Sequence, residues 1–233
     1  MIKKVKKAII LGSGLVAFED KKPKESIPYT EIPGWPIGSV KGHKGVLDKY
    51  DDVWVLRGRA HLYEGFSWED VCFPTQYLID HGLEELVVTN AAGGINPDFE
   101  IGDLMQITGY LNFLKPGRER GNIAQVLDTV SKLKKTELLE GIHHGTYVGV
   151  HGPNYESDAE VAMFRSMGAD AVGMSTIPEM ETVEKANSNG SDIKLTAVSI
   201  ITNVYGKTED LGHSGVVEVA KKSSQRLLDL LGI

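Results

Sequence analysis

The chain has 233 residues, of which 41% are hydrophobic and 24% are charged, and its formal net charge is −7. This size suits one large or two small domains, and we expect one. No stretch approaches the roughly 20 apolar residues of a membrane-spanning helix, and no basic stripe is available to neutralise nucleic-acid phosphates. Neither a membrane nor a nucleic acid is therefore an expected partner.

The first apolar run, Ala8 to Leu11, follows a cluster of lysines and imitates a signal peptide, but the glycines of Gly12-Ser13-Gly14 interrupt it. We therefore predict a first strand that ends in a glycine turn. The only cysteine, Cys72, lies between apolar residues and can form no disulfide within the chain. A single buried thiol fits a reducing cytoplasm, which is the predicted location.

Apolar runs of strand length alternate with helical patterns along the rest of the chain. Pro74 suits a first helical position and Gly82 a helix end, and Ser157 with Glu160 is a capping box. This alternation predicts an α/β sheet covered on both faces, with ligands gathered where strands end in loops. The predicted strands are 8–11, 53–56, 86–89, 147–150 and 195–201, and the predicted helices are 74–81, 158–167 and 216–231.

Residues that can bind a phosphate and a sugar follow the first two strands. Ser13 and the backbone N–H groups around it could close on an anion, although Gly-Ser-Gly is also a common tight turn. After the second strand, Arg59, His61 and Tyr63 alternate and would share one face of an extended segment. An arginine fork, an imidazole and a phenol side by side suit a phosphate next to a sugar, and the alternative is a solvated strand end.

Small and polar residues follow the later strands. Ala91 lies in a run of small residues that would admit a ligand to the backbone, unless they serve a close helix crossing. Tyr155 could stack on a base and Glu156 could accept its N–H groups, unless Glu156 only opens the next helix. Ser175 and Asn203 each end an apolar run. Asn203 could read a ring nitrogen and an exocyclic oxygen of a 6-oxopurine, or simply form a turn.

Taken together and in order, these clusters resemble the trimeric purine nucleoside phosphorylase family, which includes the methylthioadenosine phosphorylases. The likeness spans nearly the whole chain and is most specific at Gly58 to Gly65, Val87 to Pro97 and Gly168 to Thr176. It implies a single α/β domain over residues 1–233, with a mixed central β-sheet flanked by helices. It further implies a cytoplasmic homotrimer that serves purine salvage and converts nucleoside and phosphate to free base and (deoxy)ribose 1-phosphate. Phosphate is then a co-substrate, and neither a metal nor an organic cofactor is expected.

The family's functional residues carry over to this chain where its motifs match. The phosphate site would consist of Ser13, His43, Arg59, His61, the Ala91 backbone and Ser175. The ribose would be lined by Tyr63, Met174 and His213, and the purine would be held by Tyr155, Glu156 and Asn203. Among these residues, catalysis is assigned to His61, Glu156 and Asn203.

Asn203 and Ser175 resemble the nucleoside phosphorylase branch of the family, and His213 suits a polar 5′-hydroxyl. The expected substrates are therefore (deoxy)inosine and (deoxy)guanosine, and the enzyme alternative is a methylthioadenosine or methylthioinosine phosphorylase. The segment of about 113–144 is shorter than the family's, and no clear equivalent is present of the aromatic that closes a neighbouring subunit's ribose site. Its polar part, 115–135, is the predicted mobile loop. A second alternative is therefore a nucleoside-binding homologue with weak catalysis.

Overall fold

The computed structural model describes residues 4–13, 15, 18, 21–40, 42–114, 131–133, 137–207 and 212–232, and for 212–218 and 220 only the backbone. Residues 115–130 and 134–136 of the predicted loop lie outside this range, so its mobility stays a prediction. The helices and strands, in chain order, are β1 Lys7–Leu11, β2 Glu25–Pro28, η1 Tyr29–Glu31, β3 Val46–Tyr50, β4 Val53–Arg57, η2 Leu62–Glu64, α1 Trp68–Asp80, β5 Glu85–Gly94, β6 Leu104–Asn112, β7 Ser131–Lys132, β8 His143–Gly149, α3 Asp158–Ser166, β9 Ala171–Gly173, α4 Ile177–Ser188, β10 Lys194–Val204 and α5 Gly212–Leu231.

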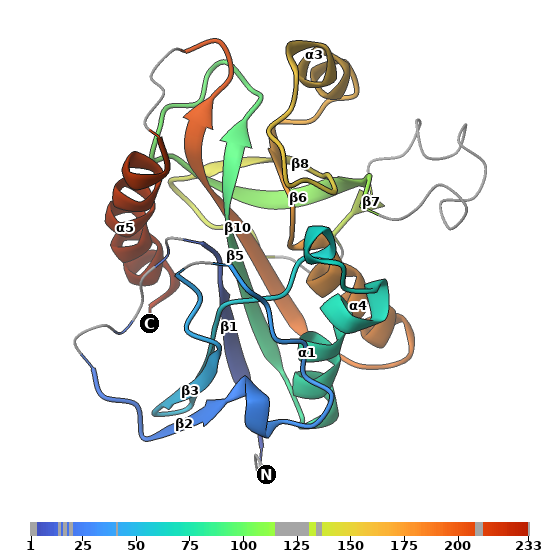
Figure 1. Cartoon of the computed structure of the whole chain (residues 1–233), viewed down its shortest axis with the longest axis vertical. Helices are drawn as coiled ribbons and strands as arrows, with labels where there is room; N and C mark the ends of the chain where they lie inside the picture. Colours follow the sequence, from blue (N-terminus) through green and yellow to red (C-terminus); the bar gives the residue numbers. More distant parts are fainter. Residues whose placement is uncertain are drawn as a thin grey trace.

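Ten strands form one mixed sheet in the order β10-β6-β8-β9-β5-β1-β4-β3-β2, with β7 beside β6. The pairs β1–β4, β1–β5 and β5–β10 are parallel, whereas β6–β10 and β5–β9 are antiparallel. Because β10 also pairs with β5, the strands β5, β10, β6, β8 and β9 close into a ring of pairings. Figure 1 shows the long strands β5 and β10 running through the middle of the molecule. The predicted α/β fold with a mixed sheet is confirmed.

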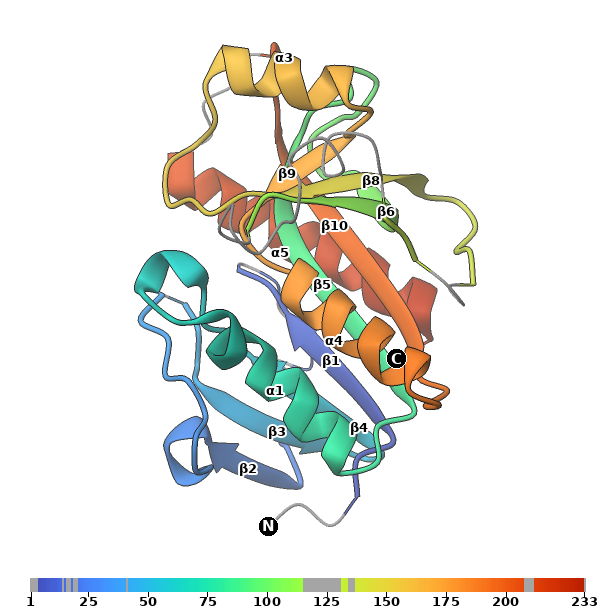
Figure 2. The same ribbon diagram turned by 90° about the vertical axis from the view of Figure 1, so that its right-hand side faces the viewer.

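Helices cover both faces of the sheet, with α1 and α4 on one side and α5 on the other (Figure 2). Ile10 and Val88 share a core cluster with Met180 of α4. Their neighbours Ile9 and Val87 point to the opposite face and share a second cluster with Leu227 of α5. Since successive strand residues face opposite sides and both sides are buried, these strands are continuous apolar runs in the sequence.

The helices α1 and α3 begin where side-chain caps are available. α3 follows Ser157, whose side chain accepts from Glu160 N, as predicted. α1 begins at Trp68 rather than at Pro74, so the predicted start is wrong. Ser67 and Asp70 form a capping box there that satisfies free backbone N–H groups, and Pro74 lies inside the helix. α1 ends before Gly82, whose φ of +91° suits the predicted helix end.

The helix α4 was not predicted, although Thr176 and Glu179 have the residue types and spacing of a capping box. In the structure Thr176 makes no side-chain cap hydrogen bond. α4 packs against α1, and the Cys72 thiol of α1 lies 3.8 Å from the Pro178 carbonyl oxygen of α4. Cys72 is half-buried, so the prediction of a buried thiol is only partly correct. Over the described ranges, no helix combines the length and the apolar character that crossing a membrane requires.

Candidate functional site

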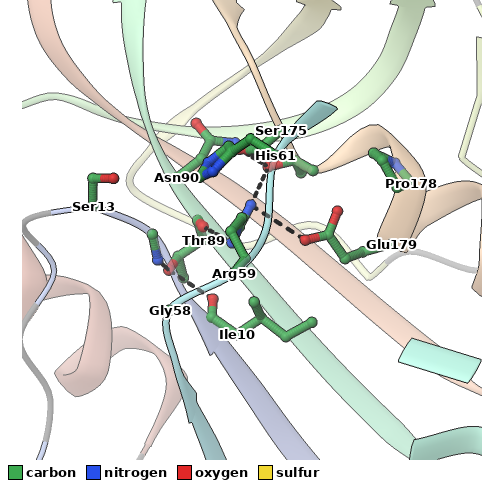
Figure 3. A network of polar contacts seen from close by, with 12 residues as sticks. Ile10, Ser13, Gly58, Arg59, His61, Thr89, Asn90, Ser175, Pro178 and Glu179 are labelled. Carbon is green, nitrogen blue, oxygen red and sulfur yellow. Dashed lines mark hydrogen bonds and ion pairs between the residues drawn. The ribbon is translucent and has the colours of Figure 1, made fainter. Parts of the chain in front are cut away.

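A polar pocket lies where β4 and β9 end and α4 begins, beside the middle of β5. Figure 3 shows Arg59 at its centre, pointing toward Glu179, with His61 and Ser175 nearby. We call it the Arg59 pocket. Its lining includes Arg59, His61, Met174, Ser175 and Glu179. Since β4 and its parallel neighbour β1 reach their carboxyl ends here, the pocket occupies the place where α/β sheets bind their ligands.

The guanidinium of Arg59 is buried and held from three sides. Nη2 donates to the Thr89 carbonyl oxygen at 2.6 Å and Nη1 to Thr176 Oγ1 at 3.1 Å. Glu179 Oε1 lies 3.3 Å from Nη1, and both charged side chains are less than a tenth exposed. Among the described residues, the Arg59 Nε has no hydrogen-bond partner. Glu179 thus stabilises a buried cation that retains an unused N–H donor.

His61 is fixed by Glu64, three residues later. Glu64 Oε2 accepts from His61 N at 2.8 Å and lies 3.1 Å from His61 Nδ1, while Oε1 accepts from Ser39 N at 2.5 Å. Burial acts to raise the pKa of Glu64, but the hydrogen bonds from Ser39 and His61 hold it below its usual value. Burial, assisted by Arg59, lowers the pKa of His61 to about 4. The ring is therefore neutral near pH 7, with hydrogen on Nδ1 and a free acceptor at Nε2.

His43 connects Ser13 to the Arg59 backbone. Its Nε2 lies 3.3 Å from Ser13 Oγ, and its Nδ1 lies 3.1 Å from the Arg59 carbonyl oxygen. Burial first, and then the charge of Arg59, lower the pKa of His43. A Cβ on Gly58 would lie 2.5 Å from His43 Cβ, and Gly58 has φ +116°, so only glycine fits here. The His43 and His61 rings stack with centroids 5.8 Å apart.

Thr176 joins β9 to α4 in a strained conformation. Its φ is +76°, which is rare for a β-branched residue. Asn90 Nδ2 donates to Thr176 Oγ1 at 2.8 Å, and the hydroxyl of Ser175 lies 3.3 Å from the same atom. Tyr147 donates to the Ser175 carbonyl oxygen at 3.1 Å. These contacts hold the strand-to-helix turn in place and direct Ser175 toward the pocket.

One edge of β5 is open beside this turn. The pairing of β1 with β5 ends at Ile10 and Val88, and β9 joins β5 only from Gly93 onward. In the described pairings, β5 residues 89–92 therefore face no strand on that side. Ala91 lies within this stretch, so a ligand can approach the backbone there.

A second polar group surrounds Gly93 on the same strand. We call it the Glu156 group, and it consists of Glu156, Asn203 and Tyr205. Asn203 pairs with Gly93 across β5 and β10, and the Tyr205 hydroxyl donates to Glu156 Oε2. A Cβ on Gly93 would lie 3.0 Å from the Tyr205 ring and 3.3 Å from Asn203 Nδ2. Gly93 lies three positions after Asn90 on β5, a rise of about 10 Å along the strand.

The structure brings most of the predicted phosphate residues together. Arg59, His61 and Ser175 line the Arg59 pocket, and Ser13 adjoins it through His43. Ala91 lies inside β5 rather than after it, because pairing with β10 extends that strand to Gly94. This extension of β5 consists of small residues and is held by backbone hydrogen bonds to β10, so no apolar run marks it in the sequence.

The predicted ribose and purine residues are only partly assembled. Met174 lines the Arg59 pocket, and Tyr63 stacks on His61 with ring centroids 4.7 Å apart. The predicted extended segment ends before Tyr63, because residues 62–64 form a 3-10 helix. Tyr155 is 76% exposed, and the side chain of His213 lies outside the described residues. The purine and ribose roles of these two residues stay predictions.

Four residues that hold the site were not predicted. Glu64 had a sequence signal, because it lies three residues after His61, the spacing of a capping box. Glu179, Thr176 and Tyr205 had none, since each meets its partner across at least 49 residues of chain. Within the ranges that the structure covers, no cluster of three or more His, Cys, Asp or Glu side chains could hold a metal ion.

Residues 6–232 match the family model described as the phosphorylase superfamily. The chain is 37% identical to purine nucleoside phosphorylase 1 of Bacillus subtilis, over 96% of this chain and 89% of that protein. It is 35% identical to the purine nucleoside phosphorylase of Bos taurus, over 94% and 84% of the two chains. Its structure is similar to that of a Schistosoma purine nucleoside phosphorylase in complex with hypoxanthine, with a TM-score of 0.73, 28% identity and coverage of 97% and 89%.

Proposed function

Because the chain belongs to the phosphorylase superfamily, we propose that it is a purine nucleoside phosphorylase, which splits (deoxy)inosine and (deoxy)guanosine with inorganic phosphate. The observation that carries this proposal is that the Arg59 pocket and the Glu156 group lie beside the same strand, β5. A pocket with a buried guanidinium, suited to phosphate, and a carboxylate and an amide suited to a purine lie beside the same strand, near Asn90 and near Gly93, which are roughly 10 Å apart along it.

Phosphate would occupy the Arg59 pocket. The Arg59 Nε, the hydroxyls of Ser13 and Ser175 and the open β5 backbone at Ala91 supply donors for its oxygens. The neutral His61 offers an acceptor at Nε2 for a phosphate O–H, because Glu64 holds its other nitrogen. The charge of the anion is then met by a buried guanidinium, where Coulomb attraction is stronger than in water.

The nucleoside would extend from this pocket toward the Glu156 group. Met174 and Tyr63 lie beside the phosphate residues, where the ribose would sit, and His213 would reach its 5′-hydroxyl. Asn203 would donate to N7 of the base, and Glu156 would accept from N1–H. This orientation places C1′ of the ribose over the phosphate.

Bond breaking follows from this arrangement. As the C1′–N9 bond lengthens, its electron pair moves to the base and the ribose gains oxocarbenium character. The phosphate anion stabilises that cation, and one of its oxygens then bonds to C1′ to give ribose 1-phosphate. Asn203 stabilises the charge that develops at N7 until the base takes up a proton. The protein's main contribution is to hold both reactants in position.

Base release from inosine, with and without phosphate, tests the proposal. We expect phosphate-dependent release of hypoxanthine, and Arg59→Lys should lower kcat/KM by about 100-fold, the usual effect of losing a positioned donor. Arg57→Lys is the matched control, because this neighbouring buried arginine pairs with Asp48 at 2.6 Å instead. Adenosine and methylthioadenosine serve as alternative substrates. No release from inosine, guanosine or either alternative would favour the nucleoside-binding homologue.

A substitution at Asn203 tests the assignment of this residue to the purine site. Asn203→Asp should shift the preference from inosine toward adenosine, because a carboxylate repels O6 and accepts from a 6-amino group. The ratio of kcat/KM for the two nucleosides measures the shift. An unchanged inosine preference would contradict the placement of Asn203 at the purine.

A further inference from the structure

Tyr205 is the one member of the Glu156 group with no role in the scheme above. It lies two residues after Asn203, and its backbone N–H donates to the Gly94 carbonyl oxygen at 3.0 Å. Its ring packs against Gly93 and against a core cluster that includes Ile95 and Phe164. The ring is therefore held at the base end of the site by both main-chain and side-chain contacts.

The hydroxyl of Tyr205 donates to Glu156 Oε2. Burial, reinforced by the hydrogen bond to Glu156, raises the pKa of Tyr205 above its usual value, so the phenol keeps its proton and remains a donor. One of the two carboxylate oxygens of Glu156 thus already accepts a hydrogen bond before any ligand binds. The carboxylate has correspondingly less capacity to accept hydrogen bonds from a base.

The 6-oxopurines hypoxanthine and guanine differ in how many hydrogen bonds they can donate to a carboxylate. Hypoxanthine presents a single N–H at this edge, from N1, whereas guanine presents N1–H and a 2-amino group, which fit the two oxygens of one carboxylate. Because Oε2 accepts from the phenol, Glu156 retains Oε1 as the unshared acceptor for the single N1–H of hypoxanthine. The guanine amino group would have to share Oε2 with the phenol, displace the phenol or stay unpaired, and each of these alternatives weakens its binding relative to a carboxylate without the phenol.

We propose that Tyr205 positions Glu156 and makes the base site selective for inosine over guanosine. The inference rests on the proposed function, since it assumes that Glu156 faces the purine. It goes further by assigning to one phenol a choice between two substrates. Tyr205 acts through Glu156 and is a positioning residue.

The variant Tyr205→Phe keeps the ring and removes the hydroxyl. We expect the ratio of kcat/KM for guanosine to kcat/KM for inosine to rise about tenfold, the effect of gaining one hydrogen bond to a charged group. Calorimetric titration with free guanine and free hypoxanthine should show the same change in relative affinity. Tyr110→Phe is the matched control, because Tyr110 also donates to a glutamate, Glu184, at 2.8 Å between β6 and α4. Its removal should leave both ratios unchanged.

The outcomes separate this inference from the proposed function. A wild-type protein that releases hypoxanthine, with an unchanged or lower guanosine ratio in Tyr205→Phe, overturns the selectivity assignment and leaves the function standing. A wild-type protein without turnover overturns the function, and the calorimetric ratio of the two bases still decides the role of Tyr205. If neither base binds, the inference fails with the function.

Discussion

At the scale of single residues, His61 shows how burial sets the chemistry of the site. The imidazole is enclosed, faces a cation at Arg59 and is held by Glu64, so it stays neutral and presents one acceptor. Glu64 is visible in the sequence as the third residue after His61. Glu179, which balances the charge of Arg59, lies 120 residues along the chain, and only the packing of α4 beside β5 brings it there.

The low pKa of His61 makes stability depend on pH. Between the usual value near 6.5 and the folded value of about 4, the unfolded chain binds a proton that the folded chain does not. The free energy of unfolding should therefore fall as the pH drops through this window, by at most about 3 kcal/mol. Urea unfolding at neutral pH and near pH 5 measures the loss, which His61→Asn should reduce.

The exposed His144 provides the comparison for this experiment. His144→Asn should retain the full pH dependence of the wild type. An identical pH dependence in His61→Asn and the wild type would show that His61 does not titrate as its burial implies.

At the scale of elements, the start of α3 connects helix stability to the site. Ser157 and Glu160 form a capping box, with Ser157 N donating to Glu160 Oε2 at 2.8 Å. Glu156 immediately precedes this cap. The cap therefore also holds the backbone from which the Glu156 carboxylate projects. The capping sequence predicted this helix correctly. The same residue types, Thr176 and Glu179, precede and begin α4, but there the strained Thr176 makes no such contact.

Ser157→Ala should lower the free energy of unfolding by about 1 kcal/mol, because a backbone N–H loses its acceptor. The KM for inosine should rise severalfold as Glu156 becomes less ordered. Ser166→Ala, at the exposed far end of the same helix, should change stability by no more than about 0.5 kcal/mol. Equal effects of the two substitutions would argue against a capping role for Ser157.

At the scale of the whole molecule, the mixed sheet decides where the two polar groups lie. β5 pairs with β10 along one edge and with β1 and then β9 along the other. Between the β1 and β9 pairings, residues 89–92 have no strand partner on that edge in the described part of the chain, beside the Arg59 pocket. The same strand carries Gly93 to the Glu156 group. The two polar groups that we propose for phosphate and for the base thereby lie beside one strand.

The predicted homotrimer belongs to this scale and rests on the family resemblance. Light scattering at micromolar concentration should report three times the chain mass of 25.4 kDa. A monomer at that concentration would contradict the prediction. It would also leave the ribose site without a neighbouring subunit, in a chain whose segment of about 113–144 is shortened.

The sequence by itself determined the fold class, five of the ten described strands and the residue types of the site. Apolar runs, capping residues and motifs such as Arg59 to Tyr63 are local, and local preferences survive in the folded chain. The tertiary structure alone decided how these pieces meet: the pairing of Arg59 with Glu179, the strained turn at Thr176 and the contact of Tyr205 with Glu156. These contacts join residues far apart in the chain, and their formation depends on packing and burial that no short stretch of sequence encodes.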